Sequence, residues 1–119
     1  MAKRIAGICY IKVNGEQLEV SGGVECPAMP VKREAVMSLT AMAGYKETAV
    51  KPFIKLTALF TADFPLVLLQ ESTDMTITAE LANGKVYTLS GAFVEGEPSA
   101  KGDDGTMELE FAGGKGIWQ

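Results

Sequence analysis

The sequence predicts a mainly β protein, a sandwich or small barrel of about seven antiparallel strands with one short flanking α-helix near 63–72. Three features support this fold class. Apolar and polar residues alternate along several segments, as they do in half-buried strands. Asn-Gly pairs, which favour tight hairpin turns, join two pairs of these segments. Only one segment has clear helix signals. At 119 residues, the chain is expected to form one domain, 1–119.

The first predicted hairpin has strands near 8–13 and 16–20 around Asn14-Gly15, because both turn residues tolerate the positive φ of a type I′ turn. Segment 21–30 contains Gly and Pro and is predicted to be a loop. The apolar residues of segment 33–42 fit both a helical and a strand period. We favour a strand there, ended by Gly44.

Segment 46–62 alternates over a long span and is predicted to be a strand. One face carries the apolar residues Val50, Ile54, Leu56, Ala58 and Phe60. The other face carries Lys51 and Lys55. Pro52 has no N–H to donate to a ladder, so the strand either lies at an edge or begins near Phe53.

The helix is predicted within 63–72. Asp63 is a typical N-cap residue, and Pro65 fits the first turn. Phe64, Val67 and Leu68 would share the apolar face that packs on the sheet.

A second hairpin is predicted from strands near 75–82 and 85–95, joined by Asn83-Gly84. One of its faces is apolar. The other carries mostly small and neutral side chains, namely Thr76, Thr78, Glu80, Thr88 and Ser90.

A polar, Gly-containing loop over 96–105 leads to the last predicted strand, 106–113. Met107, Leu109 and Phe111 are expected to point inward, and Glu108 and Glu110 outward. The only tryptophan, Trp118, lies near the end of the sequence. It either packs back on its own domain or inserts into a neighbouring molecule.

The chain has no histidine, which excludes Ser-His-Asp and Cys-His catalysis and removes the commonest metal ligand. Cys9 and Cys26 are expected to be free thiols in a reducing compartment, or a disulfide if the protein is secreted. The acidic pairs, Glu108 with Glu110 and Asp103 with Asp104, resemble solvated charge. We therefore expect no catalytic, cofactor or metal site, and a building block or binding module rather than an enzyme.

No apolar run is long enough for a membrane span, and the N-terminal residues do not resemble a signal peptide. The net charge of −4 argues against tight binding of double-stranded DNA. Residues 1–60 hold eight Lys/Arg and five Asp/Glu, whereas residues 61–119 hold three and ten. This asymmetry suits head-to-tail self-association, or it is scatter over a mixed surface.

A family resemblance appears over segment 87–113, which reads YTLSGAFVEGEPSAKGDDGTMELEFAG. The turn at Val94 to Pro98, the acidic loop at 103–105 and the strand from Gly105 to Gly113 resemble, in order, the end of tail tube proteins from Mu-like contractile-tailed bacteriophages. Segment 7–25 is similar to the N-terminal hairpin of that family. The resemblance extends over nearly the whole chain.

The resemblance implies a structural virion protein that forms stacked hexameric rings. The stack would be the inner tube of a phage tail and the conduit for DNA ejection. Implied partners are further copies of the chain, the tail sheath, baseplate and tape measure proteins, and DNA that passes without sequence-specific binding. No membrane is involved. Assembly would occur in the host cytoplasm, and the product would lie in the virion tail.

The polar face of the second hairpin is then expected to line the lumen, because neutral and acidic side chains do not retain a polyanion. Contacts between subunits are expected at Gly44, Tyr45, Lys51, Lys55, Glu108, Glu110 and Trp118. The alternatives are a secretion-system tube protein, which would share the fold, and a monomeric ligand-binding β-barrel, which would need a closed apolar cavity.

Overall fold

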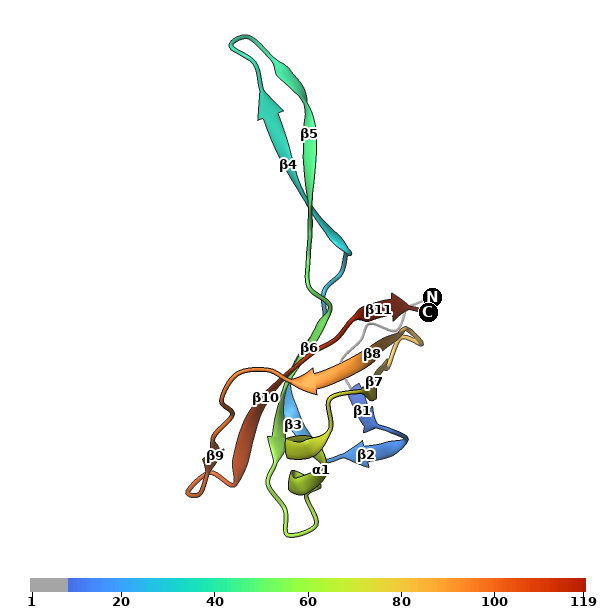
Figure 1. Ribbon diagram of the computed structural model, residues 1–119, viewed down its shortest axis with the longest axis vertical. Coiled ribbons are helices and arrows are strands. Elements are labelled where there is room, and N and C mark those ends of the chain that lie inside the picture. The colour runs from blue at the N-terminus through green and yellow to red at the C-terminus, as the bar shows by residue number, and fades with distance from the viewer. Residues whose placement is uncertain (1–8) are drawn as a thin grey trace, which may run out of the picture.

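The computed structural model describes residues 9–119, and this part of the chain contains eleven strands and one short helix (Figure 1). The strands are β1 (Cys9–Val13), β2 (Glu16–Leu18), β3 (Val20–Glu25), β4 (Val31–Met37), β5 (Met42–Ala49), β6 (Phe53–Leu59), β7 (Met75–Leu81), β8 (Val86–Val94), β9 (Ala100–Lys101), β10 (Thr106–Ala112) and β11 (Lys115–Trp118). The helix α1 spans Leu66–Glu71. The predicted mainly β fold with one short helix is confirmed. Ile8, where the first strand was expected to begin, lies outside the described residues.

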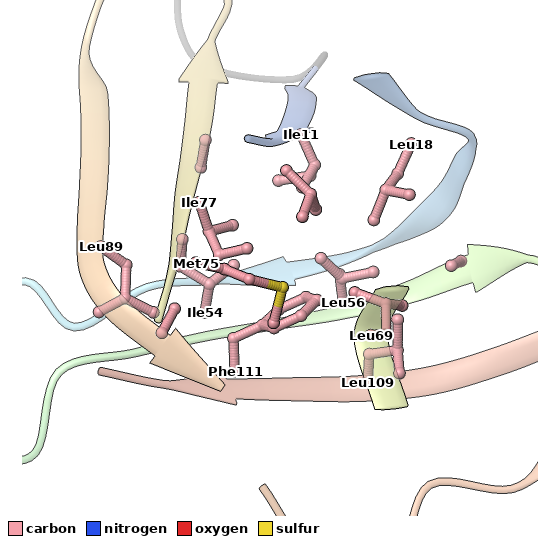
Figure 2. Close-up of a cluster of buried hydrophobic side chains, with 14 of the residues drawn as sticks. Ile11, Leu18, Ile54, Leu56, Leu69, Met75, Ile77, Leu89, Leu109 and Phe111 are labelled. Atoms are coloured by element: carbon pink, nitrogen blue, oxygen red, sulfur yellow. The ribbon is translucent and has the colours of Figure 1, made fainter. Parts of the chain in front are cut away.

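Nine strands form one antiparallel sheet in the order β2-β1-β7-β8-β10-β6-β3, with β11 paired to β8 and β9 paired to β10. β1 and β3 lie far apart along this order yet contact each other, so the sheet curls back on itself. The core fills the space enclosed by the curl (Figure 2). Its fully buried members include Ile11, Ile54, Ile77, Leu89 and Phe111, which come from five different strands. Burial of these side chains is the main stabilising contribution.

Strand β8 joins the two halves of the sheet. One of its edges pairs with β7. Its other edge pairs first with β11, from Tyr87 to Ser90, and then with β10, at Phe93 and Val94. Gly91 lies between these two pairings with φ of 64°, a left-handed conformation that favours glycine. The glycine therefore allows one strand to change partner without a break in the chain.

Strands β4 and β5 form a separate two-stranded hairpin that projects from the body and defines the 61 Å long dimension of the molecule (Figure 1). The predicted strand in 33–42 is confirmed in part, because β4 ends at Met37 and a turn over 38–41 leads to β5. Gly44 was expected to end a strand, and this is wrong. It lies within β5 opposite Val36, where the partner strand supplies the hydrogen bonds.

Residues 50–52 separate β5 from β6, so segment 46–62 does not form the single long strand that its alternation predicted. β6 begins at Phe53, as one of the two readings of Pro52 predicted. The predicted loop over 21–30 also needs correction, because β3 occupies its first half. β3 pairs with β6 through register shifts near Gly22 and Gly23, both of which have positive φ. Bulges of this kind let a glycine-rich segment join a sheet.

The two Asn-Gly turns differ. Asn14 and Gly15 both have positive φ, of 50° and 88°, as a type I′ turn requires. In the second hairpin, positive φ occurs at Gly84, and the Asn83 side chain accepts a hydrogen bond from the Lys85 N–H at 3.1 Å. That hairpin has a longer loop than a two-residue turn, although its strands match the prediction.

Helix α1 begins later than predicted. Its N-cap is Pro65, which makes no side-chain capping bond. Asp63 instead accepts a hydrogen bond from the Thr61 hydroxyl at 2.6 Å, and this bond lowers the pKa of the Asp63 carboxyl. Val67 is 62% exposed, whereas Leu69 is buried and packs on the core. The predicted buried face is wrong at Val67 and did not include Leu69, whereas Phe64 and Leu68 pack against the core as predicted.

The C-terminal strand β11 covers the end of β8. The Trp118 ring packs against Tyr87 at 4.9 Å between ring centroids, and its Nε1–H donates to the Pro27 carbonyl at 2.8 Å. Gly116 allows this close approach, because a Cβ there would lie 1.8 Å from the Tyr87 hydroxyl. In the described chain, Trp118 therefore packs on its own domain and anchors the segment that leads into the hairpin.

We expect Trp118→Ala to lower the free energy of unfolding by about 2 kcal/mol, through lost ring packing and a lost hydrogen bond. Trp118→Phe should cost about 1 kcal/mol, because it removes mainly the hydrogen bond. Urea unfolding followed by circular dichroism measures both. Ile117→Ala, on the opposite face of the same strand, is the matched control. Equal losses for all three variants would contradict the role of Trp118.

Candidate assembly surfaces

Five residues predicted to share one polar face do so in the structure. Thr76, Thr78 and Glu80 alternate along β7 with buried core residues, and Thr88 and Ser90 do so along β8. Thr78 lies directly opposite Thr88 in the ladder. We call the outer face of β1, β7, β8 and β11 the threonine face. Its exposure to a lumen stays a prediction.

The threonine face also carries charges that the prediction did not include. Lys12 on β1 lies opposite Thr78, and its Nζ forms an ion pair with Glu80 at 3.1 Å. Lys115 on β11 lies opposite Ser90, and Ile117 lies opposite Thr88. The alternation of the first hairpin already placed Lys12 on a polar face, but only the strand order shows that this face continues the threonine face.

A second surface gathers charged residues of β6 and β10 and of the segments just before β6 and just after β8. The Lys51 Nζ donates to Glu95 Oε1 at 2.6 Å and to Glu110 Oε2 at 3.0 Å, and Lys55 lies 3.8 Å from Glu110. Glu108, on the same face of β10, pairs with Lys101 at 3.7 Å. Lys51, Lys55 and Glu110, which were predicted to contact other subunits, thus contact each other within one chain. Glu95 was not among the predicted residues, because it lies far from Lys51 in the sequence.

Hydrogen bonds govern the titration of this cluster. The bond from Lys51 lowers the pKa of Glu110, and the bonds to Glu95 and Glu110 raise the pKa of Lys51. These side chains are partly exposed, so solvent and salt weaken the pairing. A role of Lys51, Lys55, Glu108 and Glu110 between subunits stays a prediction.

The hairpin carries two further predicted contact residues, whereas Trp118 packs on the body. Gly44 and Tyr45 lie on β5, with the Arg33 guanidinium 6.0 Å from the centre of the Tyr45 ring. Arg33 also pairs with Glu47 at 2.9 Å, and Glu34 pairs with Lys32 and Lys46. The charged side chains of the hairpin therefore form ion pairs with one another, both within β4 and between β4 and β5.

The described residues contain no group of three or more His, Cys, Asp and Glu side chains arranged to hold a metal ion. Cys9 and Cys26 are free thiols. Burial raises the pKa of Cys26 to about 12, with smaller contributions from Cys9 and Glu25, and burial also raises the pKa of Cys9. Neither thiol has the depressed pKa of a nucleophile. Within residues 9–119, no helix is long and apolar enough to cross a membrane.

The charged cluster predicts a pH dependence. The pKa of Glu110 is lower in the folded chain than its ordinary value near 4.5. The ionised carboxylate therefore stabilises the folded chain above that ordinary pKa. This contribution is lost as the pH falls through the lowered pKa of the folded chain. The urea midpoints of wild type and Glu110→Gln should therefore differ at pH 7 and converge at low pH. The difference should also shrink at ~1 M salt. Glu108→Gln is the control, and an equal shift for it would contradict the assignment.

A family model and a solved structure match this chain over nearly its whole length. A family model described as phage tail tube protein matches residues 2–118. The fold is similar to a chain in a cryo-EM structure of the PVC sheath/tube terminator, from an extracellular contractile injection system in its extended state. The TM-score is 0.61 at 13% identity, and the match covers 93% of this chain and 92% of that chain. No curated protein sequence matches significantly. Because the family model covers nearly the whole sequence, the chain belongs to the phage tail tube protein family.

Proposed function

We propose that this protein forms hexameric rings that stack into the inner tube of a phage tail and conduct DNA during ejection. The role is structural and needs no catalytic residue. The observation that carries the proposal is the β4–β5 hairpin, which projects from the body and has no partner within the described chain beyond its own two strands (Figure 1). An isolated two-stranded hairpin is marginally stable in water, so contacts with other subunits would stabilise it.

Open strand edges support ring formation. β2 has three residues and covers only Ile11–Val13 of β1, so no strand among the described residues 9–119 covers Cys9 and Tyr10 on that edge. At the other side of this half of the sheet, β8 is the one strand that pairs with β11 in the part of the chain that the structure describes. Edges of this kind pair readily with another chain. A ring that joins these edges would produce one continuous barrel, because closure leaves no edge exposed.

The threonine face is the surface we assign to the lumen. Lys12 is paired with Glu80, and the threonines and Ser90 add no charge. A wall of this kind offers a polyanion few fixed cations to bind. Lys115 is the exception, because it has no carboxylate partner among the residues that the structure describes.

The outer surface of such a tube would meet the sheath, and its ends would meet baseplate and tape measure proteins. Assembly would take place in the host cytoplasm. A secretion-system tube protein would share these properties. The ligand-binding barrel is less well supported, because large side chains such as Phe111, Ile54 and Leu89 fill the interior of the curled sheet (Figure 2).

A second candidate is a terminator that ends a tube. The similarity in fold to a chain in the structure of the PVC sheath/tube terminator favours it. A terminator would form one ring and stop, whereas a tube protein would continue to add rings.

Light scattering over a concentration series, with electron microscopy of the same samples, tests the proposal. Hollow tubes of stacked six-fold rings are expected. Single six-fold rings that never stack would favour the terminator. A protein that stays monomeric at every concentration, and also when it is expressed together with the sheath and baseplate proteins of its own phage, would contradict both functions.

The hairpin can be tested by Gly44→Pro. Proline removes a ladder donor and distorts β5, so we expect a folded body that no longer forms tubes. Gly44→Ala is the matched control, because nothing lies within 4 Å of the added Cβ and the Gly44 φ is not positive. Circular dichroism checks the fold, and electron microscopy measures tube length. Tubes of normal length from the proline variant would show that the hairpin is not the stacking element.

A further inference from the structure

The tip of the hairpin is apolar and uncharged. Residues 35–45 contain no Asp, Glu, Lys or Arg. Leu39 is fully exposed, and Met37 and Met42 are 65% and 61% exposed. The free energy of such a protrusion falls when its exposed apolar side chains enter an apolar site.

An apolar groove lies at the other end of the body, between α1 and the strands β8 and β10. It has a volume of about 290 Å³. Its floor includes the buried side chains of Leu69, Met107 and Leu109, and the half-exposed Phe93 forms one wall. Gln70 and Thr73 lie at its polar rim. We call this site the α1 groove.

The hairpin tip and helix α1, which borders the α1 groove, lie toward opposite ends of the longest axis (Figure 1). A protrusion at one end and a complementary hollow at the other cannot meet within one rigid chain. They can meet between two copies related by translation along that axis, which is a heterologous contact that repeats without closing. A stack of rings has this relation between consecutive layers.

Charge favours the same pairing. Segment 61–74, which contains α1, holds three Asp/Glu and no Lys/Arg, and segment 95–105 holds four Asp/Glu and one Lys. The hairpin, 31–49, holds three Lys/Arg and two Glu. The surroundings of the α1 groove are therefore acidic and the hairpin is slightly basic, so attraction would orient the approach.

We propose that the α1 groove receives the hairpin tip of a second copy in the adjacent ring, with Leu39 as the side chain that enters the groove. This inference rests on the proposed tube function and adds the site at which consecutive rings are held together. It also assigns a function to α1, which would form one wall of a receptor for the next subunit.

Disulfide cross-linking of assembled protein tests the contact. Leu39→Cys and Gln70→Cys are combined in one chain whose Cys9 and Cys26 are replaced by alanine. Because each chain then carries a tip thiol and a groove thiol, mild oxidation should give a ladder of covalent dimers, trimers and longer multimers on a denaturing gel. Leu39→Cys alone should not give the ladder. Leu39→Cys with Ser90→Cys, on the threonine face, is the matched control.

The outcomes separate the two proposals. Tubes that form but give no ladder, or give dimers through tip-to-tip contact, would overturn the docking site and leave the tube function intact. A lack of assembly by the wild-type chain, also when it is expressed together with its sheath and baseplate proteins, would overturn both. In a second measurement, Leu39→Asp should yield single rings and raise the concentration needed for tubes at least about tenfold, because a carboxylate would be buried. Gln70→Trp, which fills the groove from its rim, should have the same effect, whereas Leu39→Met should assemble normally.

Discussion

The curled sheet depends on the ability of β8 to serve two partners along one edge. Its first residues pair with β11 and its last with β10, while its other edge stays with β7. The left-handed conformation of Gly91 marks the change of partner. Because β8 links both halves of the sheet, the two apolar faces can meet and bury Leu89 and Phe111 in one core. Without that link, each half would expose its apolar face to water.

Stability and assembly are located in different parts of the chain. The body contains the core, and the described structure holds no buried polar or charged residue within it. The hairpin buries almost nothing of its own and is held by cross-strand ion pairs that solvent weakens. Trp118 and Gly113 connect the two parts, because they donate hydrogen bonds to the carbonyls of Pro27 and Pro52, one on each leg of the hairpin. The C-terminal segment therefore fixes the root of the hairpin, while its tip stays free for a partner.

Local patterns predicted the elements whose causes are local. The turn at Asn14-Gly15 and the alternation in β7, β8 and β10 depend on neighbouring residues, and these elements are present. The errors occur where the conformation of a segment depends on pairing with a strand that is distant in the sequence. β3 is a strand because β6 supplies its ladder, and Gly44 does not end a strand because Val36 lies opposite. Alternation likewise showed that the five polar residues share a face. Lys12 and Lys115 belong to the same face only because β1 and β11 flank β7 and β8, and no local sequence pattern encodes this strand order.

The proposed docking makes the tube polar, because each subunit carries its tip at one end and its groove at the other. Rings could then be added only in one orientation, and the two ends of a growing tube would differ: one would present free hairpins and the other free grooves. A partner that ends or begins the tube must therefore recognise either an apolar protrusion or an acidic-rimmed hollow, and a single partner cannot serve both ends by the same contact. The asymmetry between the basic first half and the acidic second half of the sequence would then have a structural reason, since it sets the two complementary ends of one building block.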